Sequence, residues 1–297
     1  MESRPYATAA SFKQALEYRL RQTTTGGAAL TRYRQSLVFQ RFLARVFSFF
    51  GDAAVLKGGV TMEIRISNAR STRDIDLQVV MKPLAATQVF QEIGRLDLND
   101  FLQYKIREIG PILTGLPESG GGVRLQAQAI LAGKRYGDTF GVDVVFSNQN
   151  LLIADIVTAP DYLLFAGIPA PELRLYPIEM HIAEKLHAYT MPRTRENSRI
   201  KDLPDIALLA GIREISRDTF IEAVEQVFDS RKSHSLPKSL GSPPESWNLP
   251  YREMAMNDRL PWPDIGAVFL TVSSFLNPVL HDPNKFRRWD PESWTWK

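Results

Sequence analysis

The chain has 297 residues, of which 44% are hydrophobic and 23% charged, and its formal net charge is +3. These values are ordinary for one large or two smaller globular domains, and so small a charge surplus does not by itself indicate a nucleic-acid partner. The sequence has no cysteine, which excludes disulfides and thiolate metal sites. No apolar run approaches the roughly 18 residues that span a bilayer, so we expect a cytoplasmic protein without a membrane partner.

The first half of the chain alternates between helix-like and strand-like patterns. Apolar residues recur at helical spacing over residues 11–22, 35–50 and 85–96, and residues 60–66 predict the start of another helix. Short or alternating apolar patterns predict strands over residues 53–56, 74–80, 123–131 and 139–146. The mixture predicts a mixed sheet with flanking helices.

The second half is mainly helical by the same criterion. Helical spacing recurs over residues 178–189, 203–209, 220–228 and 264–276. Residues 233–250 are rich in Ser and Pro and predict a linker or a long loop. A tail with Trp289, Trp294 and Trp296 either packs against the body or contacts a partner. We therefore predict an α/β (α+β) fold, with a mixed-sheet domain in residues 1–175 and a mostly helical domain in residues 176–297.

Asp74 and Asp76 are the strongest candidates for chemistry. Successive side chains of a strand point to opposite faces, so the two carboxylates project side by side. Adjacent carboxylates repel each other unless a proton or a cation lies between them. Mg²⁺ (or Mn²⁺) is the expected occupant, because such ions prefer oxygen ligands and bind substrate phosphates. Taken alone, this pattern more often marks an ordinary surface strand.

Gly58 and Gly59 precede this pair and predict a phosphate-binding turn. Without Cβ atoms, their backbone N–H groups can approach a triphosphate closely, and a following helix would direct its positive end to the same place. Thr72 would add a hydroxyl group, and Arg70 and Arg73 would add positive charge. The glycine turn and the acidic pair together favour a catalytic site over an ordinary strand.

Asp143 lies in the second alternating strand, where its neighbours Val142 and Val144 face the opposite way. A third carboxylate on a neighbouring strand is what a two-metal site requires, so we predict a metal ligand here. A charged residue on an edge strand is the alternative, and the pattern does not separate the two.

Four segments carry a resemblance to a known family: VLKGGVTMEIR, STRDIDL, PIEMHIAEKLHAY and RIKDLPDIALL. In this order they resemble the AbiEii/AbiGii (MenT-like) toxins, a branch of the polymerase-β-like nucleotidyltransferases, over about residues 53–210. The resemblance implies a nucleotidyltransferase whose metal is bound by Asp74 and Asp76. It also implies nucleotide contacts from Lys57, Gly58, Gly59 and Thr72.

The second block of the resemblance implies a functional Lys185 and a functional carboxylate at Asp202 or Asp205. A positioned lysine can bind the β- and γ-phosphates or stabilise charge in the transition state. Lys185 could instead be an exposed residue paired with Glu184, and Asp202 could instead cap its helix. The sequence does not choose between the two aspartates.

Some members of the resembled family are toxins that extend the 3′ end of tRNA. The resemblance therefore implies NTP and tRNA as substrates, a block of translation and a cognate antitoxin. Arg193, Arg195, Arg199 and Lys201 lie between the lysine helix and the aspartate helix, and we expect them to guide RNA. A solvated basic face is the alternative. Two other functions remain open: transfer to a small-molecule or protein hydroxyl, and a non-catalytic module that binds NTP or RNA.

Overall fold

The computed structural model describes residues 6–24, 26–66, 72–112, 121–147, 154–193, 197–282 and 285–297. The chain divides into two compact units. The first comprises Met1–Thr61 and Ser71–Tyr176, and the second comprises Met62–Arg70 and Pro177–Lys297. Compact units need not fold independently, so the predicted division into two domains at residues 175 and 176 stays a prediction.

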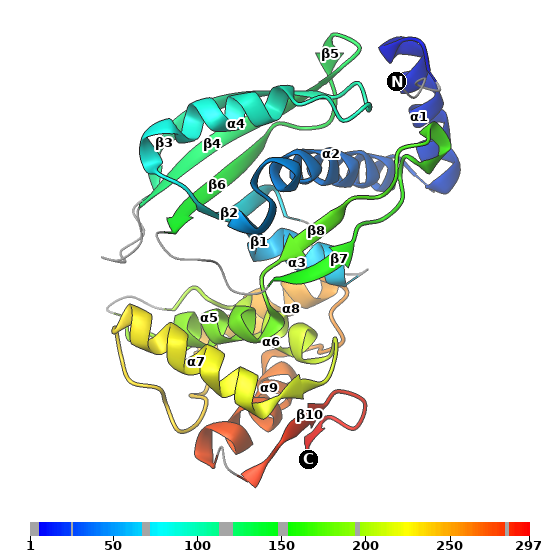
Figure 1. The fold of residues 1–297 in the computed structure, drawn as a ribbon. Helices are drawn as coiled ribbons and strands as arrows, with labels where there is room; N and C mark the ends of the chain where they lie inside the picture. The colour runs from blue at the N-terminus through cyan, green and yellow to red at the C-terminus, as the bar shows by residue number, and fades with distance from the viewer. Residues whose placement is uncertain are drawn as a thin grey trace. The chain divides into compact units, whose positions relative to one another are not determined.

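The first unit is built on a mixed sheet with the strand order β3-β4-β6-β2-β1-β8-β7 and with β5 beside β4 (Figure 1). Strand pairs β2/β6 and β1/β8 are parallel, and the other pairs are antiparallel. The bounds are β1 Ala54–Lys57, β2 Asp74–Val80, β3 Gln103–Ile112, β4 Gly122–Leu131, β5 Lys134–Arg135, β6 Phe140–Ser147, β7 Asp155–Thr158 and β8 Glu172–Leu175. Strand β2, which carries the predicted acidic pair, therefore lies in the middle of the sheet.

Helices α2 (Gly27–Phe50) and α4 (Ala86–Arg95) cover one face of this sheet (Figure 1). Alternate side chains of β4 and β6 are buried on that face. The Phe42 ring of α2 meets the Tyr104 ring of β3 at 5.3 Å between centroids, and burial of each such ring stabilises the fold by about 1.5–3 kcal/mol. The remaining helical segments of this unit are α1 Ala9–Thr23, η1 Gly51–Ala53, η2 Pro83–Ala85 and η3 Leu164–Ala166.

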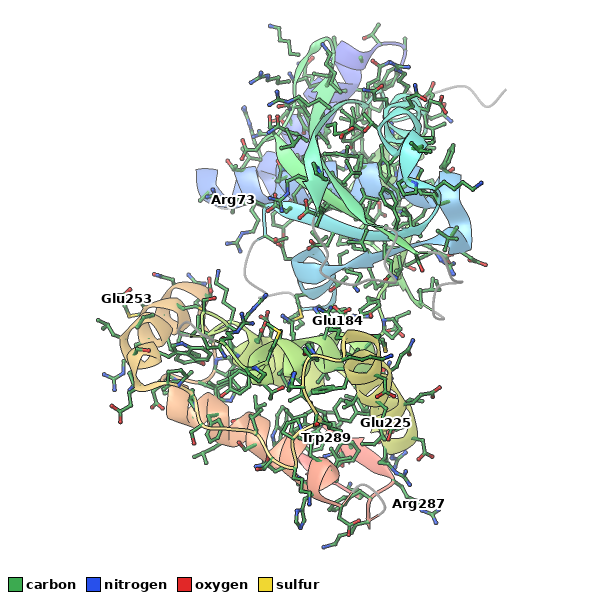
Figure 2. All side chains as sticks on the ribbon, turned by 90° about the vertical axis from the view of Figure 1, so that its left-hand side faces the viewer. Arg73, Glu184, Glu225, Glu253, Arg287 and Trp289 are labelled. Atoms are coloured by element: carbon green, nitrogen blue, oxygen red, sulfur yellow. The ribbon has the colours of Figure 1, made fainter. Side chains whose placement is uncertain are left out.

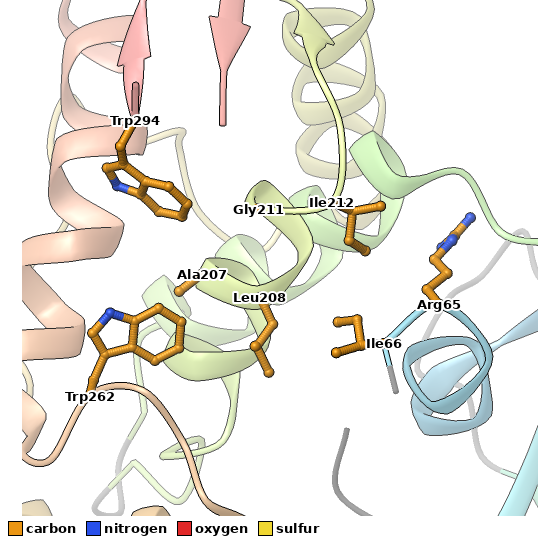
Figure 3. Close-up of a pocket in the computed structure, with 8 residues that line it drawn as sticks. All are labelled: Arg65, Ile66, Ala207, Leu208, Gly211, Ile212, Trp262 and Trp294. Atoms are coloured by element: carbon orange, nitrogen blue, oxygen red, sulfur yellow. The ribbon is translucent and has the colours of Figure 1, made fainter. Parts of the chain in front are cut away.

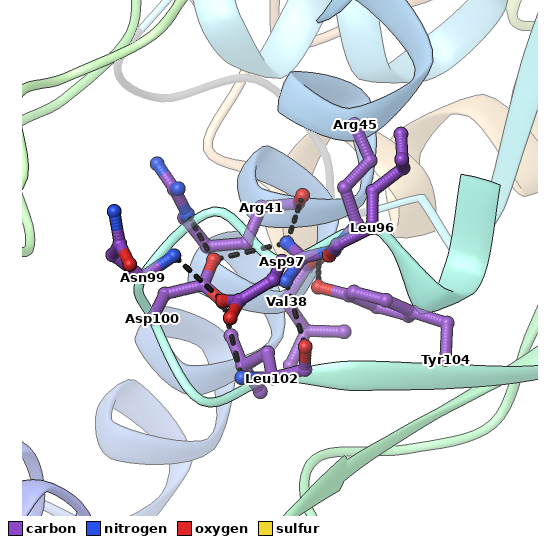
Figure 4. A network of polar contacts seen from close by, with 9 residues as sticks. All are labelled: Val38, Arg41, Arg45, Leu96, Asp97, Asn99, Asp100, Leu102 and Tyr104. Carbon is purple, nitrogen blue, oxygen red and sulfur yellow. Dashed lines mark hydrogen bonds and ion pairs between the residues drawn. The ribbon is translucent and has the colours of Figure 1, made fainter. Parts of the chain in front are cut away.

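A buried ion cluster ties α2 to the connection between α4 and β3 (Figure 4). Asp100 is fully buried and accepts hydrogen bonds from Arg41 Nε at 2.7 Å and from Arg45 Nη2 at 2.6 Å. Arg45 also donates to the carbonyl of Leu102 at 2.7 Å. Burial raises the Asp100 pKa, but the two guanidinium groups outweigh this effect and hold the pKa below its usual value. The buried Asp100 carboxylate is thus paired with two arginines of α2.

The second unit is mainly helical. Its helices in the described residues are α5 Ile178–Thr190, α6 Asp202–Ala210, α7 Arg217–Arg231, η4 Glu245–Trp247, α8 Asn248–Asp258 and α9 Ile265–His281. Its short strands β9 Ile215–Ser216, β10 Arg288–Asp290 and β11 Thr295–Trp296 pair in the order β11-β10-β9. Within the described chain, none of the helices has the length and apolarity needed to cross a membrane.

The tryptophan-rich tail packs against the helices of the second unit. Trp289 is fully buried among them (Figure 2), and its Nε1 donates to the Ala210 carbonyl at 2.8 Å. The Trp296 ring stacks on the Phe275 ring at 5.6 Å, with 10° between the planes. Of the two roles considered for the tail, packing against the body is the one the structure adopts.

Local predictions and structure differ at three places. Helix α3 (Gly58–Arg65) begins at Gly58 and not at Val60. Helix α2 begins at Gly27, eight residues before the predicted start at residue 35. The predicted long loop over residues 233–250 extends only to residue 244, because η4 begins at Glu245 and α8 at Asn248, and the buried Trp247 donates through Nε1 to the Asn197 carbonyl at 2.7 Å.

Candidate active site

The centre of the sheet carries a row of charged residues on the face opposite α2 and α4. Strand register places them on four neighbouring strands: Lys57 on β1, Asp76 on β2, Asp143 on β6 and Arg124 on β4. Paired residues of neighbouring strands project from the same face, so Asp76 and Asp143 are direct neighbours. The predicted strand pattern thus brings two of the three acidic residues into one row, with a cation at either end.

Asp74 lies one step along β2 on the same face, and Gly141 of β6 is its register partner. A Cβ atom built on Gly141 would lie 2.4 Å from Asp74 Oδ1. Any larger residue at position 141 would therefore displace this carboxylate. Asp74 is exposed and Asp76 is half-buried, so the row is open to solvent at Asp74.

Gly58 and Gly59 lie against this row at the start of α3. Gly58 has a φ of +68°, and a Cβ atom there would lie 1.8 Å from Asp76 Oδ2. A Cβ atom on Gly59 would lie 3.0 Å from Thr72 Oγ1. Only glycine allows the backbone to approach Asp76 this closely in this conformation. The first turn of α3 is therefore held beside both the acidic row and the Thr72 hydroxyl.

Burial and the neighbouring carboxylates together raise the pKa of Asp76 from 3.8 to about 6. Burial is the largest cause, and the charges of Asp143 and Asp74 add to it, while Lys57 opposes them. A carboxylate with this environment favours a proton or a bound cation. Hard divalent cations match the all-oxygen donors of Asp74 and Asp76.

Arg124 holds Asp143 in a two-pronged ion pair. Its Nε donates to Asp143 Oδ1 at 2.7 Å and its Nη2 donates to Oδ2 at 2.5 Å, and this hydrogen bonding raises the Arg124 pKa. Both carboxylate oxygens are thus engaged. Among the described residues, no group of three or more His, Asp or Glu side chains is arranged to hold a metal ion. The ligand role of Asp143 stays a prediction, and it would require Arg124 to release at least one oxygen.

Lys57 is positioned by an aromatic ring. Its ammonium group lies 4.1 Å from the ring centroid of Tyr176, which is buried. A cation over an aromatic face is favoured electrostatically. Tyr176 also donates its backbone N–H to the Leu56 carbonyl at 2.8 Å, which fixes the ring beside β1. Lys57, the register partner of Asp76, is thus positioned by its contact with the Tyr176 ring.

A second group of predicted residues lies in the second unit, where α5 packs on α6. Lys185 Nζ lies 2.6 Å from Asp205 Oδ2 and 3.4 Å from Asp202 Oδ1. All three side chains are largely buried. The alternative of an exposed Lys185 paired with Glu184 is therefore wrong, since Glu184 instead faces Arg231 at 3.7 Å.

Asp202 differs from Asp205 in its surroundings. It is the first residue of α6, and the helix is preceded by Lys201 at the N-cap position, so the alternative of Asp202 as a helix cap is also wrong. Burial raises the Asp202 pKa, and Lys185 opposes this only in part. Its buried Oδ2 atom has no hydrogen-bond partner among the described residues. Pro204 lies within the first turn of α6, where a missing backbone N–H costs little.

Three residues of these groups were not predicted from the sequence: Arg124, Gly141 and Tyr176. The spacing Gly141–x–Asp143, set beside Asp74–x–Asp76, is the only local signal for Gly141. Arg70 and Arg195 of the predicted basic residues lie outside the described part of the chain, whereas Arg193 and Arg199 are exposed.

The second unit also contains a groove of about 430 Å³ at the C-terminal end of α6 (Figure 3). Leu208, Trp262, Trp294 and Arg65 are among the residues that line it. No predicted site residue belongs to the lining, since Asp202 and Asp205 lie in the first turn of the same helix.

Comparisons with known proteins address the family. The family model described as nucleotidyl transferase AbiEii toxin of type IV toxin–antitoxin systems matches residues 41–271. No curated protein sequence matches the chain. MenT4, a nucleotidyltransferase toxin from Mycobacterium tuberculosis H37Rv, is 16% identical with a TM-score of 0.49, covering 78% of each chain. JHP933 from Helicobacter pylori is 14% identical with a TM-score of 0.45, covering 83% of this chain and 92% of its own.

The family model covers well over half of the chain and includes both the acidic row and the Lys185 cluster, whereas the two structures are too distant to add to the assignment. The chain therefore belongs to the AbiEii family of nucleotidyl transferase toxins of type IV toxin–antitoxin systems.

Proposed function

We propose that this toxin transfers a nucleoside monophosphate from an NTP to the 3′ end of tRNA, and that the row around Asp74 and Asp76 is its active site. In this reaction the tRNA 3′-hydroxyl oxygen bonds to the α-phosphorus, pyrophosphate leaves and the hydroxyl proton is released to solvent. The observation that carries the proposal is the close approach of Gly58 to Asp76 and of Gly141 to Asp74. Two glycines leave room for two carboxylates on one open face.

Asp74 and Asp76 would hold Mg²⁺ (or Mn²⁺), with Asp143 as a third ligand. When bound, the metal would neutralise the phosphates and the developing charge at phosphorus. Support comes from the raised pKa of Asp76, which burial causes in the first place and the neighbouring charges of Asp143 and Asp74 increase. Metal dependence is thus part of the proposal.

The residues around the acidic pair would position the nucleotide. Lys57, held over Tyr176, would bind a phosphate oxygen, and the backbone N–H groups of Gly58 and Gly59 would bind others. The Thr72 hydroxyl, which lies against Gly59, would add one further hydrogen bond. In the second unit, we propose a functional role for Lys185 with Asp202 or Asp205, as the resemblance to the family implies.

The acceptor and the partner are proposed by analogy with the family. A toxin of this family that modifies tRNA would block translation, act in the cytoplasm and be countered by a cognate antitoxin. We infer that the basic segment around Arg193 and Arg199 helps to guide tRNA. Replacing both by Ala, together with Arg195, is expected to lower RNA labelling several-fold. Labelling that stays unchanged at moderate salt would contradict this role.

One experiment identifies the acceptor. The protein is incubated with each α-labelled NTP, Mg²⁺, total RNA and cell extract, and the labelled product is identified, with Asp74→Ala as the control. Label on tRNA supports the proposal. Label on a small molecule or on a protein selects another acceptor for the same chemistry, and no label on any product favours a non-catalytic NTP- or RNA-binding module.

A further inference from the structure

The sheet of the first unit has one open face beside the acidic row, on strands β3, β4 and β5. Along β3, Tyr104 and Ile106 are buried against the helices, while the alternating Gln103, Lys105 and Arg107 are exposed. Strand β4 repeats this alternation. Since alternate residues of a strand project from opposite faces, these polar residues share the face that carries Asp74 and Asp76.

The exposed charged residues that the register places on this face of β3 and β5 are positive. Lys105 and Arg107 come from β3, and Arg135 comes from β5, where it is the register partner of Ile130 on β4. Arg107 donates to the neutral Oε1 of Gln126 at 2.8 Å. None of the three cations forms an ion pair with a residue that the structure describes. We call Lys105, Arg107 and Arg135 the basic strip.

The basic strip is continuous with the acidic row through the strand register. Asp74, Gly141, Gln126 and Arg107 form one row across β2, β6, β4 and β3. Lys105 lies two residues further along β3, and Arg135 is level with Gln103 beyond it. With about 3.4 Å per residue, the path along β4 from Arg124 to Ile130 covers roughly 20 Å. The strip therefore leads away from the carboxylates over the length of several nucleotides.

We propose that the basic strip binds the phosphate backbone of the RNA acceptor and leads its 3′ end to the acidic row. This inference rests on the proposed function, because it takes the acceptor to be RNA. Charge complementarity supports it: three exposed cations, which have no acidic partner among the described residues, face solvent next to the carboxylates. A polyanion is the partner that such a surface attracts, and it releases counterions on binding.

The test is RNA binding measured without chemistry. In an Asp74→Ala background, the affinity for labelled tRNA is measured by fluorescence anisotropy over a range of salt concentrations. Adding Lys105→Ala, Arg107→Ala and Arg135→Ala should weaken binding by about tenfold or more and lower the slope of log affinity against log salt by about 2–3. Thermal melts show that each variant is folded.

Lys134→Ala is the matched control. Lys134 neighbours Arg135 in β5 but pairs with Leu131, so it belongs to the opposite face. The control should bind tRNA with unchanged affinity and slope. A folded triple variant that binds tRNA as tightly as the Asp74→Ala parent would contradict RNA binding by the basic strip, even if wild-type protein labels tRNA. If the triple variant loses binding while wild-type protein labels no RNA, the strip stands and the proposed reaction fails.

Discussion

Gly141 and Gly58 leave the space that the carboxylates of Asp74 and Asp76 occupy. Glycine is therefore needed at these two positions because of the neighbouring carboxylates. A methyl group on residue 141 would overlap Asp74 Oδ1, so the carboxylate must move or the strands must separate. The absence of a side chain at Gly141 on β6 thus allows the Asp74 carboxylate on β2 to keep its position.

Gly141→Ala should lower nucleotide transfer by about 100-fold, because a displacement of about 1 Å can cost that much. Gly110→Ala is the matched control, since a Cβ atom on Gly110 of β3 would meet no atom within 4 Å. Initial rates of label transfer, together with thermal melts of both variants, check this prediction. Equal rates for the two variants would show that the Asp74 position does not matter.

Asp76 should destabilise the metal-free protein at neutral pH. Its pKa is raised from 3.8 to about 6, chiefly by burial, so the folded state binds a proton more tightly than the unfolded state does. The contribution of this group to stability is therefore greatest below pH 3.8 and is lost as the pH rises through 6. Without metal at pH 8, Asp76→Asn should raise the free energy of unfolding by on the order of 1–2 kcal/mol, after allowance for partial exposure.

The pH series supplies the control for this effect. The stability difference between Asp76→Asn and wild type should shrink as the pH falls from 8 to 4, and added Mg²⁺ should stabilise wild type more than the variant. Denaturant unfolding at each pH gives the free energies. A variant that is less stable than wild type at pH 8 would contradict the cost of burying the charged Asp76 carboxylate beside Asp143 and Asp74.

The packing of α5 on α6 distinguishes the two aspartates that face Lys185. Asp205 forms the shorter ion pair, at 2.6 Å, so Asp205→Asn leaves a buried ammonium group without its nearest partner and should cost roughly 3 kcal/mol. Asp202 has an unpartnered buried oxygen and a raised pKa, so Asp202→Asn should keep or raise the melting temperature. We predict that Asp202→Asn nevertheless loses nucleotide transfer.

Melting temperatures and label transfer of the two variants are compared side by side. A stable, inactive Asp202→Asn and an unstable Asp205→Asn would assign the functional role to Asp202. A fully active Asp202→Asn would remove Asp202 from the catalytic machinery.

At the level of elements, local sequence patterns predicted most helices and strands, but they did not predict which strands pair or in which register. DIDLQVV alternates over its whole length, and β2 has the predicted bounds of residues 74–80. The pairing of Asp76 with Asp143 depends on the parallel register of β2 and β6, which are distant in sequence, so alternation alone could not give it. Helix α8 was missed because Asn248 and Pro250 belong to a segment whose composition suggests a loop.

At the level of the whole molecule, the family match spans both compact units. The acidic row and the basic strip belong to the first unit, while Lys185, Asp202 and Asp205 belong to the second. The family region, residues 41–271, contains all of these residues. The proposed function therefore predicts that changes at these residues of either unit lower nucleotide transfer.

The most direct measurement is transfer of the α-labelled phosphate from NTP to purified tRNA by wild type, Asp74→Asn and Asp76→Asn. The account predicts Mg²⁺-dependent labelling of the tRNA 3′ end by wild type and a loss of at least about 100-fold in each folded variant. Wild-type labelling rates in both variants would contradict a reaction at this pair of carboxylates.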